Sequence, residues 1–126
     1  MTKKNVLKEK SFAFAVRTVK LCQYLRAEKQ EFILSKQILR SGTSIGANIV
    51  EACGAQSDND FIAKLHISLK EANESQYWIR LLQECEYISH NQGEDLIMDV
   101  GEIIALITAS LKTIKKKHVD NKKKEE

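Results

Sequence analysis

The 126-residue sequence contains no proline and only five glycines. Proline is the strongest helix breaker, and its absence leaves long helices uninterrupted. The abundant residues are Leu, Ile, Ala, Glu, Lys and Gln, which lose little conformational freedom on entering a helix. The composition therefore predicts an all-α chain, and the length fits one domain.

Cysteines and long apolar runs are also scarce. Cys22, Cys53 and Cys85 form an odd set without a CxxC pair, which argues against a disulfide framework or a zinc site. We expect them to be small core residues in a reducing cytoplasm. The longest uncharged run, Ser41 to Val50, is far shorter than the roughly 20 residues that span a bilayer. The apolar stretch that ends at Arg17 is too short for a signal peptide. These features predict a cytoplasmic protein without a membrane partner.

The net charge of +3 conceals a strong asymmetry along the chain. Residues 1–40 carry +7, residues 41–111 carry −8, and residues 112–126 carry +4. Basic ends around an acidic middle indicate either an anion-binding surface or head-to-tail attraction between subunits.

The spacing of apolar residues predicts four helices, over residues 6–29, 35–53, 58–89 and 93–117. Gly54 is followed by Ser57 and, three residues later, Asp60, a pattern typical of a helix end and a new helix start. Turn residues around Gly93 predict an antiparallel hairpin of the last two helices. We expect one domain over residues 1–118 and a disordered, lysine-rich tail over residues 119–126.

The first predicted helix carries two apolar stripes on nearly opposite sides. A helix on the outside of a monomeric bundle needs only one. The second stripe therefore predicts contact with another subunit. The first stripe comprises Phe12, Val16 and Val19. The second, which we assign to the oligomer interface, comprises Leu7, Phe14, Leu21 and Leu25.

The stretch RSGTSIGANIVEA, residues 40–52, suggests either a phosphate-binding loop or a helix with a thin face. Gly42 and Gly46 are four residues apart, no lysine follows Gly46, and no strand precedes them, which argues against phosphate. On a helix the two glycines share one face and allow close approach of a neighbour, at about 1 kcal/mol each in helix propensity. We expect that neighbour to be the third helix, near Trp78.

Polar residues flank these glycines. Arg40 is predicted to pair with Glu71 or Glu74, with Asn48 hydrogen-bonded nearby, and thus to fix the register of two helices. The alternative is that these are ordinary solvated charges.

The blocks QILRSGTSIGANIVEA and DFIAKLHISLKEANESQYWIRLL closely resemble the family of proteins encoded in 23S rRNA intervening sequences. The resemblance covers about residues 12–115. It implies an up-and-down antiparallel four-helix bundle that assembles into homopentamers. The structural motif predicted from the resemblance and the close packing comprises Arg40, Gly42, Ser44, Gly46, Asn48, Glu51, Glu71, Glu74 and Trp78.

A related branch of that family includes the accessory variability protein of diversity-generating retroelements, which binds nucleic acid and a reverse transcriptase. The resemblance therefore implies RNA or DNA, and a reverse transcriptase, as partners. In an up-and-down bundle the start of the first helix and the end of the fourth lie at one pole. Five copies would join these poles into a basic rim. The predicted nucleic-acid-binding residues are Lys3, Lys4, Lys8, Lys10, Arg17, Lys20, Lys112, Lys115, Lys116 and Lys117. The alternative is a solvated, solubilising lysine cluster.

No pattern for catalysis stands out. A di-metal bundle site needs Glu-x-x-His on two helices, but Ala63, Tyr87 and Lys115 stand three residues before the histidines. Glu71 and Glu74 lack an accompanying nucleophile or histidine. We therefore predict no enzyme, cofactor or metal, but an oligomeric scaffold that binds RNA or DNA. The alternatives are a protein–protein adaptor without nucleic acid and an enzyme with a site in the bundle core.

Overall fold

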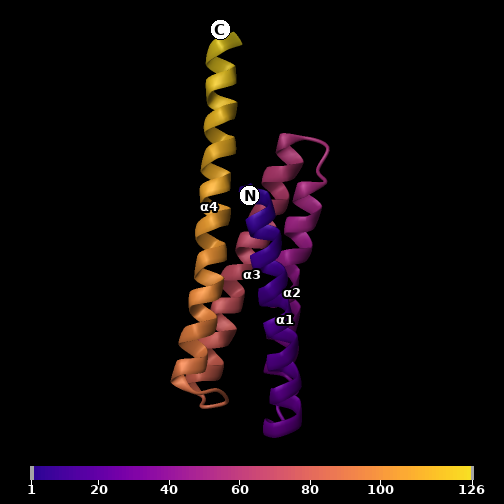
Figure 1. Ribbon diagram of the computed structural model, residues 1–126, viewed down its shortest axis with the longest axis vertical. Helices are drawn as coiled ribbons and strands as arrows, with labels where there is room; N and C mark the ends of the chain where they lie inside the picture. The colour runs from indigo at the N-terminus through magenta and orange to yellow at the C-terminus, as the bar shows by residue number, and fades with distance from the viewer. Residues whose placement is uncertain (1, 126) are drawn as a thin grey trace.

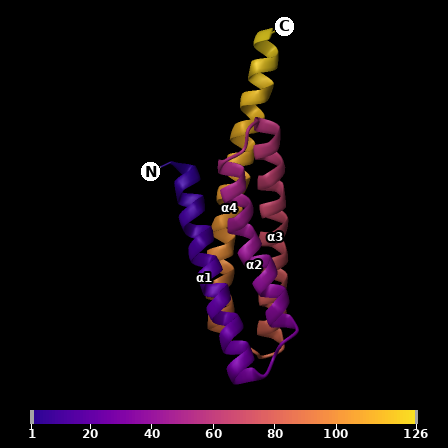
Figure 2. The same ribbon diagram turned by 90° about the vertical axis from the view of Figure 1, so that its right-hand side faces the viewer.

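The computed structural model describes residues 2–125, which form four helices connected by short turns. The helices are α1 (Lys3–Lys29), α2 (Leu34–Cys53), α3 (Asp58–Glu84) and α4 (His90–Glu125). Successive helices run in opposite directions (Figures 1 and 2). α2 packs between α1 and α3, and α4 contacts α3 more extensively than α1. The predicted all-α, up-and-down four-helix bundle is confirmed. No helix within the described range is both long and apolar enough to cross a membrane.

Two helices end at residues other than glycine in the left-handed region. Gln30 follows α1 with φ 53°, and the next amide, of Glu31, donates to the Leu25 carbonyl at 3.0 Å. Glu86 follows α3 with φ 65°, and the amide of Tyr87 donates to the Leu82 carbonyl at 2.9 Å. The end of α3 is a Schellman motif, in which glycine usually takes the left-handed position. The missing glycine explains why the sequence predicted the end of the third helix five residues too late.

Side chains cap the starts of α3 and α4. The predicted cap at Ser57 is confirmed, because its Oγ accepts from the Asp60 amide at 3.1 Å. α4 begins three residues earlier than predicted, after a reciprocal capping box. In that box the Ser89 amide donates to Gln92 Oε1 at 2.9 Å, and the Gln92 amide donates to Ser89 Oγ at 3.1 Å.

The C-terminal part of α4 extends beyond the other three helices (Figure 1). Leu111 is the last buried core residue of this helix, and the helix continues to Glu125. The predicted disorder from residue 119 is therefore wrong for residues 119–125, whereas Met1 and Glu126 lie outside the described residues. We refer to residues 118–125 as the tail. Lysines keep good helix propensity without packing, which accounts for the continuation.

The two stripes of α1 have the reverse of their predicted roles. Leu7, Phe14 and Leu25 are at most 2 % exposed and lie in the core of the chain itself, with Leu21 partly buried against them. The assignment of Leu7, Phe14, Leu21 and Leu25 to an oligomer interface is therefore wrong. The stripe left on the outside comprises Phe12, Val16 and Val19, which are 71 %, 39 % and 41 % exposed.

The cysteines do not share one environment. Cys22 is buried in the core as expected, Cys53 is partly buried, and Cys85 is exposed in the turn after α3. All three are free thiols. The expectation of three core residues is therefore wrong for Cys85.

Candidate nucleic-acid interface

The glycine face of α2 packs against α1. A methyl group added to Gly42 would lie 2.5 Å from Thr18 Oγ1, and one added to Gly46 would lie 3.3 Å from Ser11 Oγ. Close helix packing is confirmed, but the predicted partner is wrong, because Thr18 and Ser11 belong to α1. Trp78 lies on α3 and does not fill this face.

Serines join α2 to α3 on the neighbouring face. Ser75 Oγ donates to Ser41 Oγ at 2.9 Å, and Ser68 Oγ donates to the Ile45 carbonyl at 2.9 Å. Small side chains let the two backbones approach, and each hydroxyl finds a partner inside the contact. Within the described part of the chain, no buried side-chain polar atom lacks a hydrogen bond.

Arg40 binds both of its predicted partners on α3. Its guanidinium lies 3.2 Å from Glu71 and also contacts Glu74. Trp78 Nε1 donates to the same Glu74 carboxylate at 3.2 Å. The alternative of independently solvated charges is wrong here, and the group fixes α2 against α3.

The remaining motif residues also have structural roles. The Asn48 side chain donates to the Ser44 carbonyl at 2.8 Å, within α2. Glu51 lies 3.4 Å from Lys64, which adds an exposed ion pair between α2 and α3. Most residues of the motif therefore contribute to the packing of α2 against α1 or α3.

Two of the predicted nucleic-acid-binding residues are paired with acids of α4. Lys10 lies 2.6 Å from Glu102, and the hydrogen bond and charge of Glu102 raise the pKa of Lys10. Arg17 contacts Asp99 and lies 2.7 Å from Asp95. Partial burial alone would lower the pKa of Arg17, but the hydrogen bonds to both aspartates outweigh it and raise the value. In the free protein both side chains are therefore paired with acids of α4.

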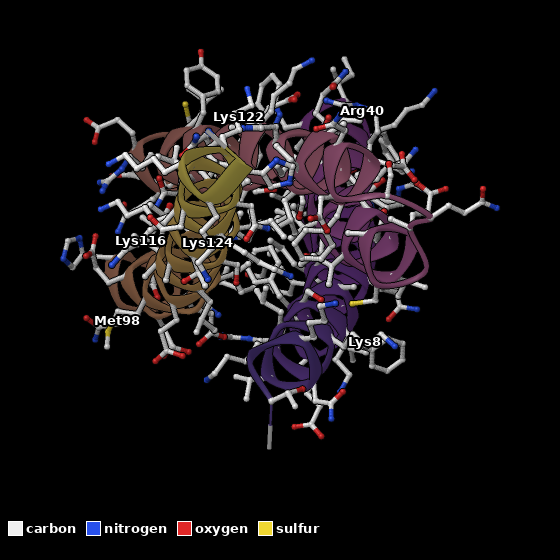
Figure 3. The ribbon with its side chains drawn as sticks, turned by 90° about the horizontal axis from the view of Figure 1, so that it is seen from above. Lys8, Arg40, Met98, Lys116, Lys122 and Lys124 are labelled. Carbon is white, nitrogen blue, oxygen red and sulfur yellow. The ribbon has the colours of Figure 1, made fainter. Side chains whose placement is uncertain are left out.

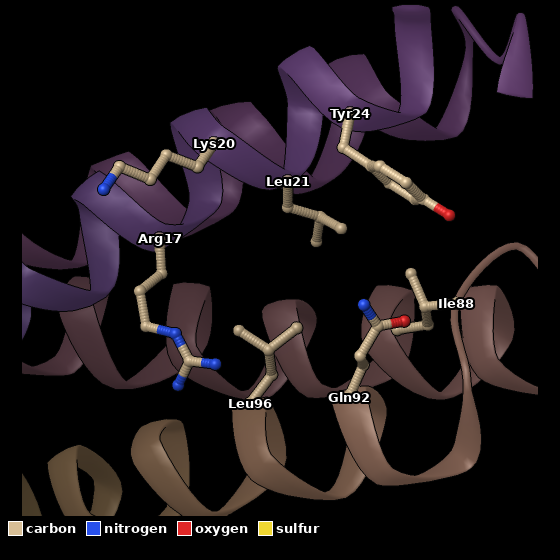
Figure 4. Close-up of a pocket in the computed structure, with 7 residues that line it drawn as sticks. All are labelled: Arg17, Lys20, Leu21, Tyr24, Ile88, Gln92 and Leu96. Atoms are coloured by element: carbon tan, nitrogen blue, oxygen red, sulfur yellow. The ribbon is translucent and has the colours of Figure 1, made fainter. Parts of the chain in front are cut away.

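Arg17 and Lys20 lie away from the pole, in a groove between α1 and α4 (Figure 4). The groove has a volume of about 320 Å³, and Leu21 and Tyr24 of α1 face Leu96 of α4 across it. At 1.5 Å per residue, Lys20 is about 25 Å along α1 from its start. The prediction that Arg17 and Lys20 belong to the basic pole is therefore wrong.

The other basic residues do gather at one end of the bundle. Lys4 of α1 and Lys117 of α4 line the same pocket, together with Phe61 at the start of α3. His118, the first residue of the tail, has its Nε2 3.0 Å from Asp58 Oδ2, and this contact attaches α4 to α3. The side chain of Lys3 lies outside the described residues. We define the basic pole by its exposed lysines, which are Lys4, Lys8, Lys112, Lys115, Lys116 and Lys117.

The tail adds three lysines that the predicted site did not include. Lys122, Lys124 and the earlier Lys116 all lie on α4, which points toward the viewer in Figure 3. Lys123 is exposed as well. Lys8 lies apart on α1 in this view. The strongest concentration of positive charge therefore follows α4 rather than α1.

Metal ligation has no geometric support among the described residues. They contain no group of three or more His, Cys, Asp or Glu side chains that could hold a metal ion.

The sequence model of the 23S rRNA-intervening sequence protein family matches residues 3–109. The chain belongs to this family. The match spans α1, α2, α3 and most of the part of α4 that packs in the bundle, and it confirms the resemblance carried by the two sequence blocks. No curated protein matches the chain in sequence.

A crystal structure from Bacteroides thetaiotaomicron shows the same fold. It is described as a protein with unknown function from the S23 ribosomal protein family, and it is 56 % identical to this chain. The similarity covers 88 % of this chain and 99 % of the Bacteroides chain, with a TM-score of 0.87. The four-helix fold of this chain is therefore shared by a crystal structure of a protein 56 % identical to it.

The family match ends before the lysines of α4. Lys112 and all later lysines lie past residue 109, the last residue matched. Their role is therefore inferred from the geometry of this chain rather than from the family.

Sequence reasoning missed Phe61 as a member of this site. It lies 61 residues into the chain, whereas the lysines beside it come from positions 4 and 117. No sequence spacing relates these residues, because their contact depends on how three helices meet at one pole. The acidic residues before Phe61 were used only to predict where the third helix begins.

Proposed function

We propose that this 23S rRNA-intervening sequence family protein is a non-catalytic, homo-oligomeric scaffold that binds RNA or DNA through its basic pole. The observation that carries the proposal is the convergence of Lys4 and Lys117 on one pocket, at the end of the bundle where the lysine-rich tail begins. Lysines from both chain ends thus form one surface.

The charges of this surface are available to an external anion. None of the ion pairs among the described side chains involves a lysine of α4 or its tail. By contrast, Lys10 and Arg17 are already neutralised within the chain. A surface of exposed lysines gains affinity for a phosphate backbone by releasing condensed counterions, so binding depends steeply on salt and little on base sequence.

Assembly is supported by the outer face of α1. Phe12, Val16 and Val19 repeat at helical spacing and remain exposed on the isolated chain. A second copy that covers this face would remove its apolar surface from water. The homopentamer implied by the family resemblance would bring several basic poles together.

The same exposed face favours a second candidate function. A different protein could cover Phe12, Val16 and Val19, in which case the chain is a protein–protein adaptor without nucleic acid. The two functions differ in whether purified protein binds nucleic acid at all.

The test is a fluorescence-anisotropy titration with a labelled RNA hairpin at about 50 and about 200 mM salt. We expect affinity to fall steeply with salt. Replacing Lys115, Lys116 and Lys117 with glutamine should weaken binding and reduce the salt slope by up to about three. The matched control replaces the exposed lysines Lys29, Lys36 and Lys70, which lie elsewhere, and should change binding little. The proposal is wrong if the wild-type chain does not bind at low salt, or if both triple variants behave alike.

A further inference from the structure

Phe61 forms the common wall of two adjoining pockets at the basic pole. One pocket, of about 190 Å³, is lined by Phe61, Ile114, Ser110, Thr113, Lys4 and Lys117. The other, of about 170 Å³, shares Lys4, Phe61 and Ile114 with it and extends toward the turn between α2 and α3. The Phe61 ring is only partly buried. A partly exposed aromatic ring and two lysines thus line the same opening.

The size of each pocket limits what can enter it. Pockets that enclose whole small-molecule ligands measure about 300–1,000 Å³. A pocket of 190 Å³ is too small for such a ligand but suits one planar group attached to something larger. The occupant is therefore expected to be part of a polymer whose remainder lies outside the pocket.

The residues that line the pocket determine which kind of planar group can bind there. Lys4 Nζ lies 4.9 Å from the centroid of the Phe61 ring, and Lys117 lines the same pocket. Proteins that bind single-stranded nucleic acid combine an aromatic ring that stacks on a base with cations that contact the phosphates. Ser110 and Thr113 add hydroxyl groups that can hydrogen-bond to a base edge.

α4 continues the cationic surface away from the pocket. From Lys117 to Lys124 the helix rises about 10 Å, and both ends of this segment carry exposed lysines. Phosphates that flank a base in the pocket can therefore contact the tail. Asp58, the acidic residue that lines the second pocket, has its carboxylate engaged by His118.

We propose that Phe61 stacks on one unpaired base of a single-stranded RNA or DNA, with Lys4 and Lys117 on the adjacent phosphates. This inference rests on the proposed function and specifies its substrate as unpaired nucleic acid. Lys4 covers the ring face in the free protein, and its flexible side chain moves to a phosphate when a base enters. Stacking of a base on an aromatic ring is stronger than an exposed cation–π contact, which favours the exchange. A duplex keeps its bases stacked inside and cannot use the pocket.

The experiment compares labelled oligo-U and oligo-dT with a duplex of equal length, by anisotropy at low salt. Phe61→Leu keeps apolar bulk but removes the aromatic face, and it should weaken single-strand binding roughly ten- to one-hundred-fold. Duplex binding should be unchanged. Tyr77→Leu, at an exposed aromatic residue elsewhere on α3, is the control and should change neither. Lys117→Gln should weaken the binding of both the single strand and the duplex.

A second measurement uses the wild-type protein alone. An oligonucleotide with one 2-aminopurine should change its fluorescence on binding, because the reporter leaves its neighbouring bases to stack on Phe61. The inference is overturned if single strand and duplex bind equally, if Phe61→Leu matches Tyr77→Leu, or if 2-aminopurine emission is unchanged on binding. In those cases salt-dependent binding would still support the proposed function. If no oligonucleotide binds at low salt, the proposed function fails together with the inference.

Discussion

Gly42 of α2 and Thr18 of α1 are in direct backbone-to-side-chain contact across the bundle. A Cβ atom on Gly42 would lie 2.5 Å from Thr18 Oγ1 and 2.7 Å from Thr18 Cγ2. Thr18 cannot easily move, because it is 1 % exposed and its Oγ1 donates to the Phe14 carbonyl at 2.8 Å. This contact explains why a glycine occupies the interior of a helix at that point.

Gly42→Ala is therefore expected to destabilise the protein. Alanine gains about 1 kcal/mol in helix propensity, but overpacking a well-filled contact typically costs about 1–3 kcal/mol, which leaves a net loss of up to about 2 kcal/mol. Urea unfolding monitored by circular dichroism should show a lower midpoint with an unchanged slope.

Gly101→Ala is the matched control on α4. An added Cβ at Gly101 meets no atom within 4 Å, so only helix propensity changes. This variant should be more stable by about 0.5–1 kcal/mol. Equal effects of the two substitutions would contradict the close approach of α2 to α1.

The glycine pattern shows how far sequence reasoning can reach. Gly42 and Gly46, four residues apart, correctly predicted a thin helix face, because spacing along one helix follows from its own geometry. The partner helix was predicted wrongly, since the choice between α1 and α3 depends on how the helices cross. The partners of Arg40 were easier to predict, because Glu71 and Glu74 carry the opposite charge and lie one helical turn apart.

The basic pole was predictable only in part. An up-and-down topology correctly placed Lys4 and Lys117 at the same end of the bundle. It did not exclude Lys10 and Arg17, because their pairing with acids of α4 depends on the rotation of α1 about its axis. The same rotation decided which stripe of α1 entered the core. A periodicity argument identifies two faces but does not rank them when both are apolar.

Glu86→Gly is expected to stabilise the protein. Glu86 lies in the turn just after α3 with φ 65°, a conformation that costs an L-residue about 1 kcal/mol or more and costs glycine nothing. Part of that gain is lost to the greater freedom of glycine in the unfolded chain, so we expect about 0.5–1 kcal/mol. Thermal unfolding should show a midpoint a few degrees higher. The paired control, Glu84→Gly in the last turn of α3, should be destabilising; a gain in both would contradict the left-handed assignment.

Arg17→Gln should weaken the attachment of α1 to α4. The substitution leaves Asp95 and Asp99 without their shared cation. Because Arg17 is 36 % exposed, solvent screens these pairs and the expected loss is only about 0.5–1 kcal/mol. The raised pKa of Arg17 means that this stabilisation is present at all lower pH values at which the aspartates are ionised, and is lost only as pH rises through that raised value.

The measurement for Arg17→Gln is urea unfolding at low and high salt, with Lys10→Gln as the comparison. The Lys10 side chain is exposed to solvent, so its pair with Glu102 should contribute no measurable stability. High salt should reduce the difference between wild type and Arg17→Gln. A salt-independent difference would show that Arg17 acts through packing of its aliphatic stem instead of its charge.

Phe12→Glu should dissociate the proposed oligomer without unfolding the chain. Phe12 is 71 % exposed, so a charge there should change the stability of a single bundle by no more than about 0.5 kcal/mol. In an assembly that buries the outer face of α1, the substitution removes about 1.5–3 kcal/mol of favourable aromatic burial per site. It also leaves a buried, unpaired carboxylate.

Light scattering coupled to size exclusion should show a multimer for wild type and about 14 kDa for the variant. Met98→Glu is the control, because Met98 is 69 % exposed on α4 and projects away from the bundle (Figure 3). A monomeric wild type, or equal dissociation by both variants, would show that the outer face of α1 is not where copies of this chain meet.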